Sequence, residues 1–170
     1  ASNSSIFQLN AVAPVAGTSG FPTSDLIVGT STPGENIPVW DFDQTTVEYL
    51  DFYGTINHNY SGTGGVTVRL CWSHSTGSGN CVWVGAFRRI EDDAEDLDTT
   101  AFTYSTRSVT DAAPSAVGEV SYCEITFTSG QIDGFTVGDN VIFRLARAAS
   151  DGADTLSGDA ELHSIYIRET

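Results

Sequence analysis

Val66-Thr67-Val68-Arg69-Leu70-Cys71-Trp72 is the stretch that decides the fold class, because apolar residues occupy every second position. Successive side chains of a β-strand point to opposite faces, so this spacing places the four apolar residues Val66, Val68, Leu70 and Trp72 together. The other face carries polar and small side chains. The stretch therefore predicts a strand with one face in a core and one face in water.

Similar stretches recur at fairly regular intervals from Ile37 onward, separated by Gly, Asn, Asp and Ser. This pattern is typical of sandwiches and barrels, and not of units that alternate strands with helices. The sequence therefore predicts an all-β fold, a jelly-roll-type sandwich of about eight antiparallel strands. The expected strands cover residues 37–43, 46–56, 65–73, 81–90, 101–111, 118–128, 140–148 and 160–168. Between the sixth and seventh, residues 128–139 are predicted to form a crossing loop with a short helical turn that closes one end of the core.

Residues 1–36 do not share this alternation, since Ser, Asn, Pro and Gly interrupt every apolar run. We therefore predict an extended N-terminal arm at 1–36 and a β-sandwich domain at 37–170. Such a segment cannot fold alone, so its apolar side chains are expected to fill grooves on a partner. The residues expected to bind the partner are Ile6, Phe7, Leu9, Phe21, Leu26 and Ile27.

The charge of the chain restricts its partners. Its formal net charge is −15, with 22 acidic residues against 7 arginines and no lysine. Phosphate backbones require a basic surface and anionic membranes repel an acidic one, so neither nucleic acid nor membrane is an expected partner. No apolar run approaches the roughly 20 residues that span a bilayer.

The three cysteines cannot all pair within one chain. Cys123 shares a strand face with Ile125 and Phe127, so a core position is expected. Cys71 and Cys81 flank a turn-rich stretch at the two ends of a predicted hairpin. A cross-strand disulfide could form there if the register places them opposite each other, whereas a reducing cytosolic assembly path would leave both thiols free.

No catalytic motif joins the three histidines, His58, His74 and His163, and the chain is not predicted to be an enzyme. The acidic pairs Asp41/Asp43 and Glu48/Asp51 leave a glycoside hydrolase as a distant alternative, because that chemistry needs two carboxyl groups flanking a sugar.

No cofactor or metal site is predicted. The acidic run at 91–98 and the turns at 151–154 and 158–161 offer oxygen ligands, yet they lack the spacing of a loop that wraps calcium. Solvated loops are favoured, and a structural calcium ion is the alternative at these places.

The aromatic residues raise a carbohydrate-binding alternative, because aromatic rings on a β-sandwich can stack on the faces of sugars. The candidates are Trp40, Tyr49, Tyr53, Tyr60, Trp72 and Trp83, and loop aromatics such as Tyr53 and Tyr60 are expected to stack. Trp72 and Trp83 share strand faces with core residues and are expected to be buried.

Several strand and turn stretches resemble a group of small proteins encoded among the structural genes of tailed bacteriophages, over about residues 37–168. The stretches are Trp40-Asp41-Phe42-Asp43, Glu48-Tyr49-Leu50-Asp51-Phe52, Val68-Arg69-Leu70-Cys71-Trp72, Val82-Trp83, Phe87-Arg88-Arg89-Ile90, Gly138-Asp139, Phe143-Arg144-Leu145 with Arg147, and Gly158-Asp159-Ala160-Glu161-Leu162.

The resemblance implies a non-enzymatic virion structural protein with a jelly-roll body, most simply a capsid decoration or cement protein. It would lie on the exterior of a virion assembled in the host cytoplasm. Its expected partners are the major capsid protein or another virion protein, bound through the arm and one edge of the sandwich, and further copies of itself in a symmetric oligomer. The carbohydrate-binding or adhesion module is the second hypothesis.

Overall fold

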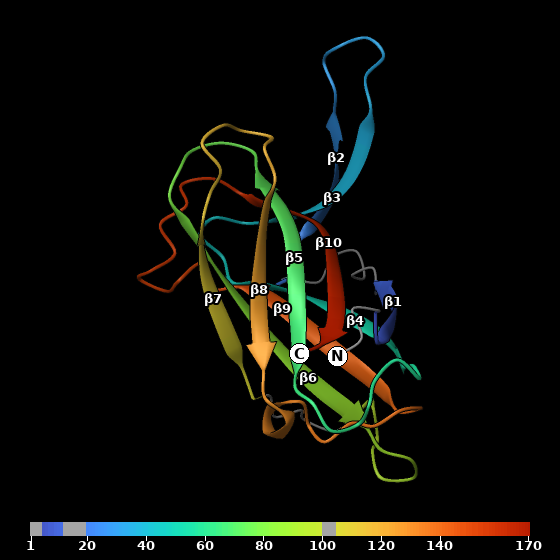
Figure 1. Cartoon of the computed structure of the whole chain (residues 1–170). Coiled ribbons are helices and arrows are strands. Elements are labelled where there is room, and N and C mark those ends of the chain that lie inside the picture. Colours follow the sequence, from blue (N-terminus) through green and yellow to red (C-terminus); the bar gives the residue numbers. More distant parts are fainter. Residues whose placement is uncertain (1–4, 12–19, 100–104) are drawn as a thin grey trace.

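The computed structural model describes residues 5–11, 20–99 and 105–170, which form a sandwich of two five-stranded antiparallel sheets (Figure 1). The first sheet has the strand order β1-β4-β9-β6-β7, and the second has the order β2-β3-β10-β5-β8. The strands are β1 (Phe7–Ala11), β2 (Thr23–Val28), β3 (Asn36–Phe42), β4 (Glu48–Ile56), β5 (Val66–His74), β6 (Asn80–Ile90), β7 (Arg107–Ala112), β8 (Ser121–Phe127), β9 (Asn140–Arg147) and β10 (Ala160–Glu169).

The connections confirm the predicted jelly-roll type. From β3 onward the chain passes from one sheet to the other at every connection except the one between β6 and β7. Two late strands lie inside the sheets, β9 between β4 and β6 and β10 between β3 and β5. The eight predicted strands correspond to β3–β10. The expected strand at 101–111 is observed from Arg107, and part of it lies outside the described residues.

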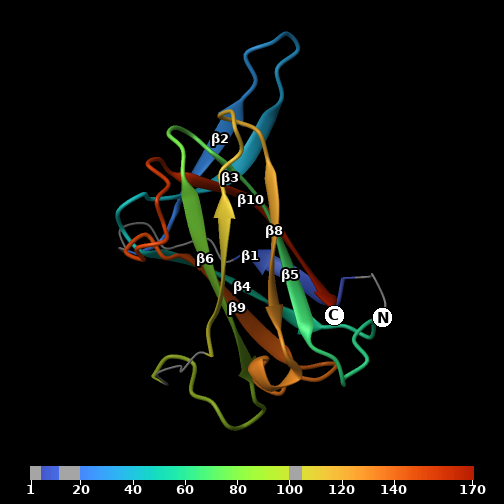
Figure 2. The same ribbon diagram turned by 60° about the vertical axis from the view of Figure 1, so that its left-hand side comes forward.

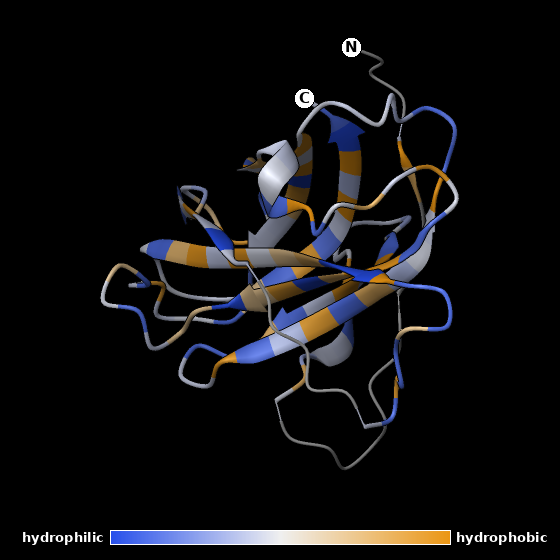
Figure 3. Cartoon of the chain, turned by 90° about the horizontal axis from the view of Figure 1, so that it is seen from below, coloured by the Kyte–Doolittle hydropathy of each residue, from blue (hydrophilic) through white to orange (hydrophobic). Residues whose placement is uncertain are grey.

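The alternation that predicted the fold fills the core. The apolar residues Val66, Val68, Leu70 and Trp72 of β5 are all fully buried. Trp83 reaches the same core from β6, and its ring packs edge-on against Trp72 with the centroids 5.9 Å apart. The alternating bands of hydropathy along the strands are visible in Figure 3. The burial predicted for both tryptophans is therefore confirmed.

The predicted loop at 128–139 closes one end of this core. A short 3₁₀ turn at Ser129–Gln131 lies at the lower end of the sandwich (Figure 2). After it, Ile132 and Phe135 are buried, and the ring of Phe135 packs against Tyr60 at a centroid distance of 5.4 Å.

The N-terminal segment differs from the prediction, because much of what the structure describes of it belongs to the sandwich. β1 pairs with β4 from Phe7 opposite Ile56, and β2 pairs with β3 from Thr23 opposite Asp41. Each strand therefore lies at an edge of one sheet. The expected domain boundary at residue 36 is therefore wrong. Short, interrupted apolar runs are long enough to form an edge strand, although their alternation is too weak to predict one from the sequence.

A buried ion pair joins the ends of several strands. Arg147 of β9 has no exposed surface, and two of its nitrogens lie 3.1 and 2.8 Å from the carboxylate of Asp154. It also donates to the carbonyl oxygens of Phe42, Leu156 and Gly158. The bonds to Asp154, Leu156 and Gly158 fix the loop after β9, and the bond to Phe42 joins β9 to the end of β3 in the other sheet, so Arg147 is a structural residue.

Among the described residues there is no helix that is long and apolar enough to cross a membrane.

Candidate ligand-binding face

The outer surface of the first sheet carries a group of residues whose types suit a ligand. Along β4, Leu50, Phe52 and Ile56 are buried, and the alternate residues Tyr49, Asp51 and Tyr53 point outward. Neighbouring β9 presents Arg144 on the same side, because Arg144 lies directly opposite Asp51 in the strand register. We call these four residues, Tyr49, Asp51, Tyr53 and Arg144, the β4–β9 face.

A planar ion pair lies at the centre of the β4–β9 face. The Nε and Nη2 atoms of Arg144 each lie 2.7 Å from a carboxylate oxygen of Asp51. The guanidinium carbon also lies 4.0 Å from the ring centroid of Tyr49. The ring of Tyr49 in turn packs against that of Phe21, with the two centroids 4.8 Å apart. Two charge-assisted hydrogen bonds and a cation–π contact hold the guanidinium plane in one orientation.

A shallow apolar hollow of about 100 Å³ borders this ion pair. Binding pockets for whole small molecules usually measure about 300–1,000 Å³, so this hollow can receive one edge or one substituent of a ligand. Its lining residues are Val84, Gly85, Ala86, Thr106, Arg144 and Ala146.

The two tyrosines predicted to stack on glycans have different positions. Tyr53 lies on the β4–β9 face with 37% of its surface exposed. Tyr60 is buried, its ring packs on Phe135, and its hydroxyl donates to the carbonyl oxygen of Gly64. The prediction for Tyr60 is therefore wrong, because a hydroxyl that finds a backbone acceptor lets the ring enter the core.

Arg144 is the residue of this face that sequence reasoning missed. The alternation Phe143-Arg144-Leu145 was enough to turn it outward. However, its partner Asp51 is 93 positions away, and only the pairing of β4 with β9 brings the two together.

The six residues expected to bind a partner differ in their exposure. Ile6 and Phe7 are buried in the chain's own core, so a partner cannot reach them, and their predicted role is wrong. The side chain of Leu9 lies outside what the structure describes. Phe21 is half-buried against Tyr49. Leu26 is 53% exposed and Ile27 half-buried, so these two remain accessible on β2.

The predicted hairpin between Cys71 and Cys81 is not formed. Cys71 lies on β5 of the second sheet and Cys81 on β6 of the first, and all three cysteines are free thiols. The turn-rich stretch between them crosses from one sheet to the other, so the cross-strand geometry of a disulfide is absent. Cys123 is buried as predicted.

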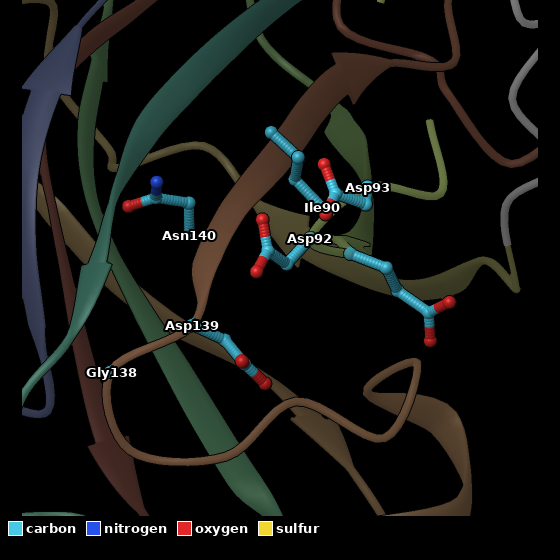
Figure 4. A pocket seen from close by; sticks show the side chains of 7 residues that line it. Ile90, Asp92, Asp93, Gly138, Asp139 and Asn140 are labelled. Atoms are coloured by element: carbon cyan, nitrogen blue, oxygen red, sulfur yellow. The ribbon is translucent and has the colours of Figure 1, made fainter. Parts of the chain in front are cut away.

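An acidic hollow of about 420 Å³ lies where the loop after β6 meets the start of β9 (Figure 4). Asp92, Asp93 and Asp139 line it, and Asp139 is paired with Arg89 at 2.9 Å. Within the described residues, no group of three or more His, Cys, Asp or Glu side chains is placed to hold a metal ion.

Of the four carboxyl groups considered for hydrolysis, Asp41 has a buried oxygen without a hydrogen-bond partner, and the other three are engaged in other contacts. Asp43 accepts hydrogen bonds from the hydroxyl of Thr45 and from the amides of Thr45 and Thr46, which lower the pKa of its carboxyl. Glu48 accepts from the amide of Asp43, although burial raises its pKa. Asp51 forms an ion pair with Arg144. These carboxylates serve turns and strand pairing.

A serine, a histidine and a glutamate meet on the outer side of the second sheet. The buried Ser73 hydroxyl donates to Glu161 at 2.6 Å and lies 2.8 Å from Nε2 of His163. Since the single hydroxyl proton goes to Glu161, the oxygen accepts from the ring nitrogen. A nucleophilic serine would instead donate its proton to histidine, so this geometry is that of a structural hydrogen-bond network.

Comparison with known proteins identifies no family. No family model matches the chain, and no curated protein is significantly similar to it. Among solved structures, a carbohydrate-binding module in complex with β-1,4-galactotriose shares 12% identity at a TM-score of 0.39, with 96% of this chain and 88% of that chain covered. A carbohydrate-binding module specific for non-crystalline cellulose shares 13% identity at a TM-score of 0.49, with 91% and 86% covered. Identity this low does not transfer a ligand from those proteins to this chain.

Proposed function

We propose that this chain is a carbohydrate-binding domain that holds a neutral glycan on the β4–β9 face. The observation that carries the proposal is the exposed ring of Tyr53 on the same strand face as the fixed pair of Asp51 and Arg144. A sugar ring has apolar faces and a rim of hydroxyl groups. An aromatic side chain suits the first, and paired donors and acceptors suit the second.

The ion pair is organised before any ligand arrives. Tyr49 and Asp51 hold the guanidinium of Arg144 in place, so little side-chain freedom remains to be lost on binding. The two contacts with Arg144 use only two of the roughly four acceptor positions of a carboxylate. Asp51 can therefore orient hydroxyl groups of a ligand while it keeps the arginine in position.

The charge of the chain favours an uncharged ligand. A net charge of −15 repels uronic acids and sulfated sugars at long range. A neutral oligosaccharide is not affected by this field, and its hydroxyl groups can donate to Asp51.

Screening against neutral, acidic and amino-sugar glycans tests the proposal, followed by calorimetry on each ligand found. We expect saturable binding to neutral oligosaccharides and a loss of about tenfold in affinity for Tyr53→Ala. Tyr122→Ala is the matched control, because Tyr122 is 59% exposed on β8 of the other sheet. Absence of saturable glycan binding would overturn the proposal, as would a loss of binding in Tyr122→Ala with Tyr53→Ala unaffected.

A structural role in a particle is the second candidate, and the exposed apolar residues Leu26 and Val28 of β2 favour it. A decoration protein needs such a surface to attach to a capsid protein. Under this proposal the chain co-sediments with purified virions, and Leu26→Ser with Val28→Ser lowers its occupancy while Tyr53→Ala does not. Equal occupancy of the virions by the unchanged protein, the double variant and Tyr53→Ala would contradict this role for β2.

A further inference from the structure

β2 and β3 form a hairpin that extends beyond the rest of the sandwich at the top of Figure 1 and of Figure 2. β10 supports only the root of β3, from Trp40 to Phe42. The distal pairs, such as Leu26 opposite Pro38 and Ile27 opposite Ile37, have no further strand beside them in the described chain. A two-stranded ribbon in water is marginally stable by itself, so cover from another molecule would stabilise this one.

The outer edge of β2 is open. β2 is the terminal strand of its sheet and, within the part of the chain that the structure describes, pairs only with β3. Its other edge therefore presents backbone N–H and C=O groups to which an incoming strand can bind. Of the features that usually protect such an edge, β2 has one charged side chain, Asp25, and no proline, lysine or bulge.

The two faces of β2 differ in chemistry. Leu26 and Val28 lie on one face, with 53% and 62% of their surfaces exposed. Asp25 is an exposed residue on the opposite face, which it shares with the half-buried Ile27. A strand added to this edge would place alternate side chains beside these two faces. Apolar residues would meet Leu26 and Val28, and the intervening residues would meet Asp25 and, beyond it, Ile27.

Electrostatics determine which charge the intervening residues of the added strand should carry. No arginine occurs in the sequence between residues 20 and 43. The charges that act on Asp41, at the root of the hairpin, come from Glu161, Asp25 and Asp159, and all three are acids. A second copy of the chain would bring two Asp25 carboxylates and two chains of charge −15 together, which is unfavourable. A basic segment has the complementary charge.

We propose that the free edge of β2 is a docking site for a strand of another protein in which basic and apolar residues alternate. The backbone supplies the pairing, Leu26 and Val28 receive the apolar side chains, and Asp25 receives a lysine or arginine. This inference is independent of glycan binding, which uses the opposite sheet.

Titration of the full chain with synthetic hexapeptides, followed by amide chemical shifts, tests the proposal. The probes are Ac-Lys-Val-Lys-Val-Lys-Val-NH2, its glutamate analogue, and a peptide of the same composition in the order Val-Val-Val-Lys-Lys-Lys. We expect saturable shifts at residues 23–28 with the alternating lysine peptide, and affinity lower by about fivefold for the other two. Equal binding of all three peptides, or shifts centred on other strands, would overturn the proposal.

Charge reversal provides the sharpest variant. Asp25 is exposed, so Asp25→Lys should fold normally and should exchange the preference, favouring the glutamate peptide over the lysine peptide. Leu26→Ser with Val28→Ser should weaken both peptides, while Tyr122→Ala should change neither. If Asp25→Lys still preferred the lysine peptide over the glutamate peptide, the proposal would be wrong. Dimerisation of the free chain in sedimentation would overturn the proposal in favour of a second copy as the partner. Binding to neutral lipid vesicles that Leu26→Ser abolishes would overturn it in favour of a membrane.

Discussion

Arg144 and Asp51 lie directly opposite each other on β9 and β4, and two hydrogen bonds of 2.7 Å join the guanidinium to the carboxylate. The pair is partly exposed, with 32% and 24% of the two side chains accessible. A surface ion pair of this kind contributes little to stability, about 0–1 kcal/mol. Under the proposed function, this fixed geometry serves the glycan as well as the pairing of β4 with β9.

Arg144→Lys tests that interpretation. Lysine keeps the charge but loses the planar fork and the stacking on Tyr49. We expect glycan affinity to fall by about tenfold, with the free energy of unfolding changed by less than about 1 kcal/mol. Calorimetry and urea denaturation measure the two quantities. Arg168→Lys is the control, since Arg168 pairs with Glu124 on the other sheet. A parallel loss of stability and affinity in Arg144→Lys would assign the pair to folding.

Arg147 is expected to behave in the opposite way. Its ion pair with Asp154 is fully buried, and its remaining donors satisfy backbone carbonyl groups. Arg147→Ala leaves the carboxylate buried without its partner, which costs about 3–5 kcal/mol. Urea denaturation should show this loss, whereas Arg168→Ala should remain within about 1 kcal/mol of the unchanged protein. Arg147→Ala with near-normal stability would mean that water reaches this site.

Asp41 gives the stability a dependence on pH. Burial, followed by the negative charges of Glu161, Asp25 and Asp159, raises its pKa to about 6 from an ordinary value of 3.8. The folded chain holds this proton more tightly than the unfolded chain does. The resulting stability is complete below about pH 4 and is lost as the pH rises through about 6. Asp41→Asn should therefore be more stable than the unchanged protein at pH 8, by about 1 kcal/mol after screening, with a smaller gain at pH 4.

Urea denaturation of both proteins at each pH measures this difference. The comparison of the two proteins is needed because His163 acts in the opposite direction. Burial lowers the pKa of His163, so its contribution to stability is present above the ordinary value of 6.5 and is lost as the pH falls below that value through the lowered pKa. An equal gain for Asp41→Asn at pH 4 and pH 8 would show that the carboxyl does not titrate as described.

The thiols should differ in reactivity. Burial raises the pKa of Cys123 to about 12 and that of Cys81 further, and both lie in the core. Cys71 is only half-buried. A thiol reagent should therefore modify one cysteine per folded chain and three in denaturant, counted by mass spectrometry. Only one reactive thiol in denaturant would indicate a disulfide and contradict the separation of Cys71 and Cys81.

The body of the fold could be predicted because its strands carry their own signal. In β5, four apolar residues on alternate positions predict both the strand and its buried face. β1 and β2 carry no such signal, since edge strands bury little and their pairing depends on β4 and β3. For the same reason Ile6 and Phe7 were expected on a partner rather than in the core.

The candidate site was less accessible to prediction. Tyr53 could be identified from the sequence as a candidate for stacking on a glycan. The burial of Tyr60 could not be predicted in the same way, because it depends on a hydrogen bond from its hydroxyl to the carbonyl group of Gly64. The pairing of Asp51 with Arg144, and that of Ser73 with Glu161, depends on which strands are neighbours. Such long-range pairings are properties of the topology, which local patterns do not contain.

The central position of β10 has a consequence for biosynthesis. Because β10 completes the second sheet between β3 and β5, that sheet cannot close until Glu169 has left the ribosome. Until then the apolar faces of β3 and β5 are without a neighbour between them, at the stage when nascent chains aggregate most readily. The many acidic residues of the chain repel other chains during this interval. Folding should thus begin late and, with pairings so distant in sequence, proceed slowly.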